Sequence, residues 1–239
     1  MSGHSKWSTI KRKKEINDLK RGKLFTKYLN QIVQLSKEGG GDPKSNFLLK
    51  NAIDRARAVN VSMDSINKAI SKGITFKSSS DFSEYLYEAY GPFGIAIIVK
   101  CITDNKNRAI SNLRSVVEKN GGKIVDNGTL SWQFDKRGVI TIKMEDINNI
   151  ESIENILINT DGVLDYEYND DIFSIYTDPK DLKLVKDIID NNFSINDIEI
   201  SLIPKIRVKI EGKDREDKVF KFISAIESLD DVDSVYLNV

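Results

Sequence analysis

The sequence predicts an α+β protein of three domains: a small N-terminal helical bundle and two ferredoxin-like βαββαβ domains, one inserted into the other. Three observations support this fold class. Apolar residues recur every three to four positions up to residue 77, and short strand-like runs then alternate with amphipathic segments. The order beyond residue 77 is βαβ, an interruption with the same pattern, and βαβ again. The expected domains are 1–77, then 78–135 with 205–239, and 136–204 as the insertion.

The first domain is expected to hold three helices. Apolar pairs spaced by four residues start at Leu24 and end before GGG at 39–41, whose glycines stop a helix. The pair Asp42-Pro43 is typical of an N-cap followed by proline at the first helical position, so the second helix is predicted to begin there. Ser62 is the predicted cap of a third, shorter helix.

The outer α/β domain begins with an apolar run. GIAIIVKCI at 94–102 is apolar almost throughout, as in a strand covered on both faces. A helix capped by Thr103 or Asp104 is expected to follow. Alternating apolar residues predict further strands at 129–134 and 205–211, and a helix and a terminal strand are expected to close the chain.

The inserted domain repeats this pattern. GVITIK at 138–143 predicts a strand, and an apolar stripe through Ile153 predicts the helix after it. Two strand-like runs within 163–177 are separated by NDD, which favours a hairpin. A stripe through Val185 predicts a second helix, and the alternation at 198–203 predicts the last strand.

Positive and negative charge are segregated along a chain that is neutral as a whole. Residues 1–77 contain 17 Lys and Arg against 6 Asp and Glu, whereas residues 78–239 contain 19 against 30. Such asymmetry indicates a part that binds a polyanion joined to a part that does not. A protein partner is therefore expected at the acidic α/β domains, and the sequence does not predict the oligomeric state.

Residues for catalysis are sparse. The chain has one histidine and one cysteine, whereas nucleophilic triads and metal sites usually need several. Neither G-x-G-x-x-G nor a Walker motif occurs. The acidic pairs Asp170-Asp171 and Asp230-Asp231 fall in predicted turns; spacing leaves a paired-carboxylate hydrolase open, but nothing favours one. The sequence therefore predicts a binding protein, not an enzyme, with no cofactor and no metal.

Composition also bears on location. The longest apolar run, GIAIIV at 94–99, is too short to cross a bilayer, so no membrane partner is expected. No apolar segment follows the basic start, which argues against a secretory signal peptide. Cys101 is expected to be a small buried hydrophobe, and a lone cysteine fits a reducing compartment. A cytoplasmic protein is expected.

The first 27 residues hold nine Lys and Arg against Glu15 and Asp18. Neutralising phosphates with such a segment releases counterions, so it is expected to bind nucleic acid with steep salt dependence. Trp7 can stack on a base or pack back on the bundle, His4 can contact a phosphate or face water, and KRKK at 11–14 can also be a solvated helix face. The predicted nucleic-acid-binding residues are His4, Lys6, Trp7, Lys11, Arg12, Lys13, Lys14, Lys20, Arg21, Lys23 and Lys27.

The α/β domains lack the features of an RNA platform. RNA-recognition modules stack bases on aromatic side chains of their central strands. The runs at 94–102 and 205–211, expected to take those places, contain no aromatic residue. These domains are therefore predicted to contact protein or to act as a scaffold.

Several stretches, in this order along nearly the whole chain, resemble the signature sequences of the YebC family, also called PmpR-like. They are GHSKW at 3–7, KRGKLFTK at 20–27, GGGDP at 39–43, YGPFG at 90–94, TDNKNR at 103–108 and YTDP at 176–179. The resemblance implies a helical N-terminal domain and two α/β domains, one inserted in the other. In YGPFG, Phe93 replaces the first of the two glycines that usually end the pattern.

The resemblance also implies a function. Family members are described as cytoplasmic transcriptional regulators that bind DNA. Others resemble ribosome-associated factors, in contact with ribosomal RNA or tRNA, that help translation past stretches such as prolines; mitochondrial relatives are translational activators of a cytochrome oxidase subunit. Carried over to this chain, the nucleic-acid contact comprises His4, Lys6, Trp7 and the cations up to Lys27.

A hypothesis from another class is a small-molecule sensor. Paired ferredoxin-like units often bind metabolites at their interfaces. On that interpretation, YGPFG at 90–94 and NGG at 120–122 contact the ligand. The simpler interpretation is that their glycines permit turns and helix caps.

Overall fold

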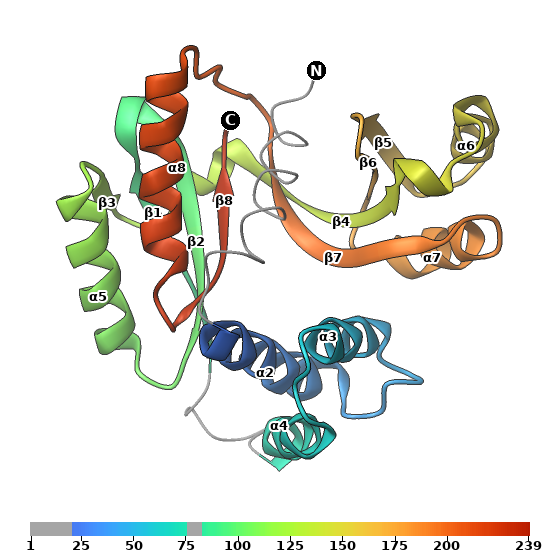
Figure 1. Cartoon of the computed structure of the whole chain (residues 1–239), viewed down its shortest axis with the longest axis horizontal. Coiled ribbons are helices and arrows are strands. Elements are labelled where there is room, and N and C mark those ends of the chain that lie inside the picture. Colours follow the sequence, from blue (N-terminus) through green and yellow to red (C-terminus); the bar gives the residue numbers. More distant parts are fainter. Residues whose placement is uncertain (1–20, 76–82) are drawn as a thin grey trace. The chain divides into compact units, whose positions relative to one another are not determined.

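The computed structural model describes residues 21–75 and 83–239 of the chain, with side chains from Lys23 onward (Figure 1). The described residues form helices and two four-stranded antiparallel sheets, with strand orders β3-β1-β2-β8 and β5-β6-β4-β7. The predicted α+β class is confirmed. One compact unit comprises residues 134–209, and the other comprises the described residues up to 133 together with 210–238.

The N-terminal helices form a bundle whose core is apolar. The helices are α2 (Arg21–Gly39), α3 (Phe47–Ala58) and α4 (Met63–Thr75). Ile32, Leu49 and Ile66 are fully buried in one core cluster, to which Ile102 of β2 also belongs. The predicted apolar stripes are therefore the faces that these helices bury against each other. The predicted cap of α4 is confirmed, because the Ser62 hydroxyl accepts from the amide of Ser65 at 3.2 Å.

Helix α3 begins later than predicted, so the start at Asp42-Pro43 is wrong. The Asp42 carboxylate instead accepts from the amide of Lys44 at 2.9 Å and forms a turn. Asn46 is the cap: its side-chain oxygen accepts from the amide of Leu49 at 3.1 Å. The Asn46 amide group also donates to the carbonyl oxygens of Leu35 and Gly40, both at 2.9 Å. Asn46 therefore joins the end of α2 to the start of α3.

The outer sheet carries two helices. Its elements are β1 (Ser83–Tyr90), β2 (Ala96–Thr103), α5 (Lys106–Lys119), β3 (Lys123–Val125), α8 (Lys213–Glu227) and β8 (Val232–Leu237). Helices α5 and α8 contact each other and the strands, and α2 contacts β2 and β8 (Figure 1). Strand β2 is buried along almost its whole length, which explains its apolar sequence.

Two of the strand predictions for this sheet are wrong. Residues 205–211 form no strand, and the edge strand is Lys123–Val125 instead of 129–134. Residues Ser131–Gln133 form a short 3₁₀ turn in which the Trp132 side chain is 64 % exposed. The buried carboxylate of Glu88 accepts hydrogen bonds from the amides of Gly128, Leu130 and Ser131. Because a side chain satisfies these donors, the segment needs no partner strand.

Two further details of the outer unit differ from expectation. Strand β1 is not predicted from the sequence; the outer sheet begins with the β1–β2 hairpin, which precedes α5 and β3. Helix α5 is capped by Asn105, whose side chain accepts from the amide of Arg108 at 3.0 Å. The predicted caps Thr103 and Asp104 are therefore wrong.

The inserted unit follows the predicted order βαββαβ. Its elements are β4 (Phe134–Lys143), α6 (Ile150–Ile158), β5 (Val163–Tyr168), β6 (Ile172–Thr177), α7 (Leu182–Asp190) and β7 (Ile195–Pro204), preceding α8 in the chain (Figure 1). The hairpin β5–β6 and both helices are confirmed. Ile153 and Val185, on the predicted stripes, are fully buried.

None of the helices in residues 21–75 and 83–239 is both long enough and apolar enough to span a bilayer.

Cys101 is fully buried in β2, as predicted, and burial with nearby Asp231 and Asp233 raises the pKa of its thiol to about 12. A buried neutral thiol reacts poorly because the thiolate is the nucleophile. We therefore expect an aromatic disulfide reagent at pH 8 to label Cys101 only as fast as the protein unfolds. Labelling kinetics across a urea series measure this. Fast labelling of the folded protein, at the rate of a free thiol, would contradict the burial.

Candidate nucleic-acid interface

Most of the predicted nucleic-acid-binding residues lie outside the described part of the chain. Arg21 begins helix α2, but its side chain is not described. Lys23 and Lys27 are described with their side chains. The residues outside the description are His4, Lys6, Trp7, Lys11, Arg12, Lys13, Lys14 and Lys20.

Lys23 and Lys27 lie near carboxylates of the same compact unit. The Lys23 ammonium donates to the carbonyl oxygen of Ser228 and lies 3.7 Å from the Asp230 carboxylate. Lys27 is one of the cations that lower the pKa of Asp233. The structure thus brings these two lysines to the C-terminal strand region, where they help hold α2 in place.

Asp233 is the centre of this contact between α2 and the outer sheet. Its side chain is 2 % exposed and lies 2.7 Å from the ammonium of Lys100 on β2. Gln31 of α2 donates to the same carboxylate at 2.5 Å. Burial alone would raise the pKa of Asp233, but Lys100, Lys27 and these donors lower it below its ordinary value. Asp233 is therefore a charged, fully partnered anchor.

The described helices also present cations to solvent. Residues 21–75 contain ten Lys and Arg against four Asp and Glu. Lys50 and Arg57 are exposed and lie seven residues apart, on one face of α3. Among the described residues, neither side chain enters an ion pair. Neither residue is among the predicted nucleic-acid-binding residues; their seven-residue spacing, off the apolar stripe of α3, was the signal that could have found them.

The motif TDNKNR has a structural role in the described residues. Arg108 forms ion pairs with Asp104 and Asp231, each at 2.8 Å, and hydrogen bonding to Asp231 raises the pKa of its guanidinium. Thr103 also donates to Asp231 at 2.7 Å. These contacts join the start of α5 to the turn before β8. Over residues 21–75 and 83–239, no three histidine, cysteine, aspartate or glutamate side chains form a group suited to a metal ion.

Comparison with known proteins gives matches over nearly the whole chain. A family model described as the TACO1/YebC protein N-terminal domain matches residues 5–75, and a model described as the TACO1/YebC second and third domain matches residues 82–239. The gap between the two matches corresponds closely to the segment 76–82 between α4 and β1.

Curated relatives and a solved structure give the same picture. A "probable transcriptional regulatory protein" of Desulforamulus reducens is 41% identical over 239 residues, covering 100% of this chain and 98% of the relative. One from Desulforapulum autotrophicum is 43% identical, covering 100% and 96%. The crystal structure of a conserved hypothetical protein from Aquifex aeolicus superposes with a TM-score of 0.82 at 33% identity, covering 92% of this chain and 90% of that one.

Proposed function

This chain belongs to the TACO1/YebC family, and we propose that it is a non-enzymatic nucleic-acid-binding regulator of gene expression, acting as a DNA-binding transcriptional regulator. Relatives that match along the full chain are named probable transcriptional regulatory proteins, which supports regulation at the level of the family.

The observation that best supports this proposal is the separation of positive and negative charge along the chain. Cations exceed anions by 17 to 6 in residues 1–77, and anions exceed cations by 30 to 19 in the remainder. The basic part gains free energy on phosphates by counterion release, whereas the acidic part is repelled by them. The proposed contacts are His4, Trp7 and the cations from Lys6 to Arg21, joined by the exposed pair Lys50 and Arg57 on α3. Lys23 and Lys27 lie against the C-terminal region instead and are not part of this proposed contact. The acidic α/β units are proposed to meet a protein partner.

A second candidate is a ribosome-associated translation factor that contacts ribosomal RNA or tRNA. One observation favours it: the exposed positions of α3 are Lys50, Asp54, Arg57 and Ala58. Helices that read a DNA groove typically place asparagine or glutamine beside arginine on one face. The exposed positions of α3 include neither asparagine nor glutamine, so its cations suit phosphate contacts better. Backbone contacts suffice for a protein that recognises a folded RNA by its shape.

Crosslinking in cells tests both candidates. The tagged full-length protein is irradiated, purified under denaturing conditions, and the attached DNA and RNA are sequenced. Enrichment of discrete chromosomal sites supports the transcriptional regulator, and enrichment of ribosomal RNA or tRNA supports the translation factor. Recovery of neither above the level of an irrelevant tagged protein would contradict the proposed function.

A further inference from the structure

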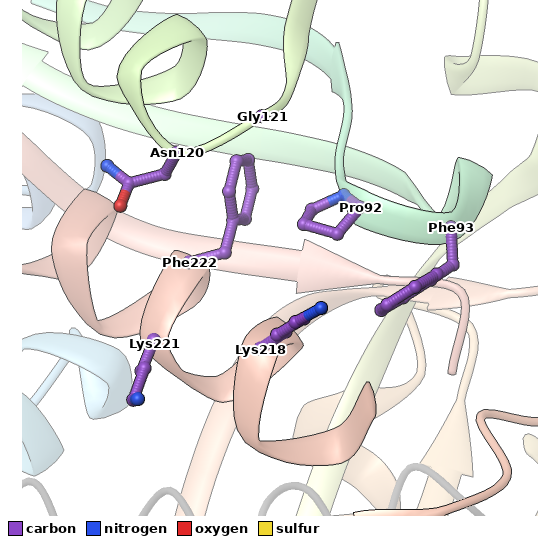
Figure 2. Close-up of a pocket in the computed structure, with 7 residues that line it drawn as sticks. All are labelled: Pro92, Phe93, Asn120, Gly121, Lys218, Lys221 and Phe222. Carbon is purple, nitrogen blue, oxygen red and sulfur yellow. The ribbon is translucent and has the colours of Figure 1, made fainter. Parts of the chain in front are cut away.

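A pocket of about 360 Å³ lies within the unit that contains the outer sheet (Figure 2). Two loops that are distant in sequence meet there, the β1–β2 turn and the turn that ends α5, and helix α8 closes the pocket. The lining residues are Pro92, Phe93, Asn120, Gly121, Lys218, Lys221 and Phe222.

Phe93 is held in a conformation that an L-residue rarely adopts. Its φ is 62° and its ψ is 19°, in the left-handed region that favours glycine. Its side chain is nevertheless 46 % exposed, so little burial offsets the strain. The guanidinium of Arg215 lies 5.3 Å from the centre of the ring and fixes it from one side. Strained residues cluster at binding sites, which makes this exposed ring a candidate contact.

The pocket walls are held closely by the surrounding elements. A side chain added at Gly122 would lie 2.7 Å from the Phe222 ring and from the carbonyl oxygen of Tyr90. The turn after α5 is thus pressed against both α8 and β1. Asn120 donates to the carbonyl oxygen of Val116 at 2.8 Å, which fixes its side chain at the pocket rim. The result is a preformed site, which costs little ordering to fill.

Helix α8 supplies positive charge to this site. Arg215, Lys218 and Phe222 are spaced by three and four residues, so they share one helix face. Lys218 extends toward the space between Phe222 and Phe93, whereas Lys221 points to the other side of α8 (Figure 2). Among the described residues, neither lysine enters an ion pair.

We propose that this pocket binds one nucleotide unit, with the base stacked against Phe93 and Pro92 and the phosphate on Lys218. An aromatic face beside an ammonium that enters no ion pair among the described residues matches the two parts of a nucleotide, the base and the phosphate. The unit can come from a free nucleotide or from an unpaired nucleotide of a strand. The second source rests on the proposed function, and the first does not.

Calorimetric titration of the full-length protein tests the site, with the four ribonucleoside monophosphates and single-stranded tetranucleotides as probes. Phe93→Gly is expected to weaken binding about tenfold, because the ring loses its stacking contact. Glycine adopts the φ of this position without strain, so the unfolding midpoint of the variant should be unchanged or higher. Lys218→Gln should also weaken binding. The matched control Lys213→Gln, exposed on the same helix but outside the pocket, should not.

The probes separate the two sources. Equal affinity for mononucleotide and tetranucleotide supports a free nucleotide, and markedly tighter binding of the tetranucleotide supports a strand; both require dependence on Phe93. No binding of any probe, or binding that is equal in Phe93→Gly, would overturn the proposal. Retention of long nucleic acid in that case would leave the proposed function standing.

Discussion

Changing Lys11, Arg12, Lys13 and Lys14 to glutamate is expected to lower the affinity of the full-length protein for nucleic acid about a hundredfold or more near physiological salt. Each of these cations can neutralise one phosphate and release its counterions. Their replacement removes those contacts and places four anions in the basic segment. Fluorescence anisotropy with labelled duplex DNA and with a labelled ribosomal RNA fragment measures the change.

A matched control variant distinguishes the effect of the basic segment from the effect of the protein's net charge. Changing Lys136, Lys180, Lys183 and Lys209 to glutamate alters the net charge equally, but these exposed lysines lie in the inserted unit. We expect affinity within about threefold of the parent, because these lysines are not among the proposed phosphate contacts and the influence of exposed charges outside a contact is largely screened by salt. Equal losses in the two variants would show that net charge, and not the basic segment, governs binding. Unfolding midpoints of both variants check that the fold is retained.

The substitution Asp233→Asn is expected to destabilise the protein by about 3 kcal/mol, because it removes the nearer of the two carboxylates beside the Lys100 ammonium and leaves only Glu84, at 4.0 Å, among the described residues. The side chain of Lys100 is 20 % exposed, so water offsets part of the loss. Asparagine keeps the shape of the site and still accepts from Gln31. Urea unfolding measures the difference. The control Asp230→Asn removes a carboxylate that is 70 % exposed, and its effect should stay below about 1 kcal/mol.

The same pair predicts a pH dependence. The folded-state pKa of Asp233 is lowered, so its ionised form stabilises the protein above the ordinary carboxyl pKa of 3.8. That contribution falls as the pH drops below this value and is lost once the pH passes the folded pKa. The stability gap between parent and Asp233→Asn should therefore be full at pH 7 and shrink below pH 4. A gap that stays constant from pH 7 to pH 3 would contradict the ionised anchor.

The local sequence pattern correctly predicted those helices and strands that bury an apolar face. The stripes through Ile153 and Val185 and the continuous run in β2 led to the right elements because burial sets their periodicity. The same reasoning predicted a strand at residues 129–134, and this prediction was wrong. The amides of Leu130 and Ser131 donate to Glu88, some forty residues earlier, and alternation alone does not reveal such a partner.

The candidate sites, too, could be predicted from the sequence only in part. Charge counts located a basic N-terminal part, but they could not show that Lys23 meets Ser228 and Asp230 about two hundred residues away. Likewise, the sequence drew attention to the loops at 90–94 and 120–122 separately. Only the fold brings Phe93 and Asn120 to one pocket with Lys218.

The salt dependence of binding tests the electrostatic account most directly. Affinity for duplex DNA and for ribosomal RNA is measured from low to moderate salt, and the logarithm of the association constant is plotted against the logarithm of salt concentration. If at least four phosphates are neutralised, the slope for the bound partner should be about −3 or steeper. A flat slope, or no binding of either polymer even at the lowest salt, would contradict the account.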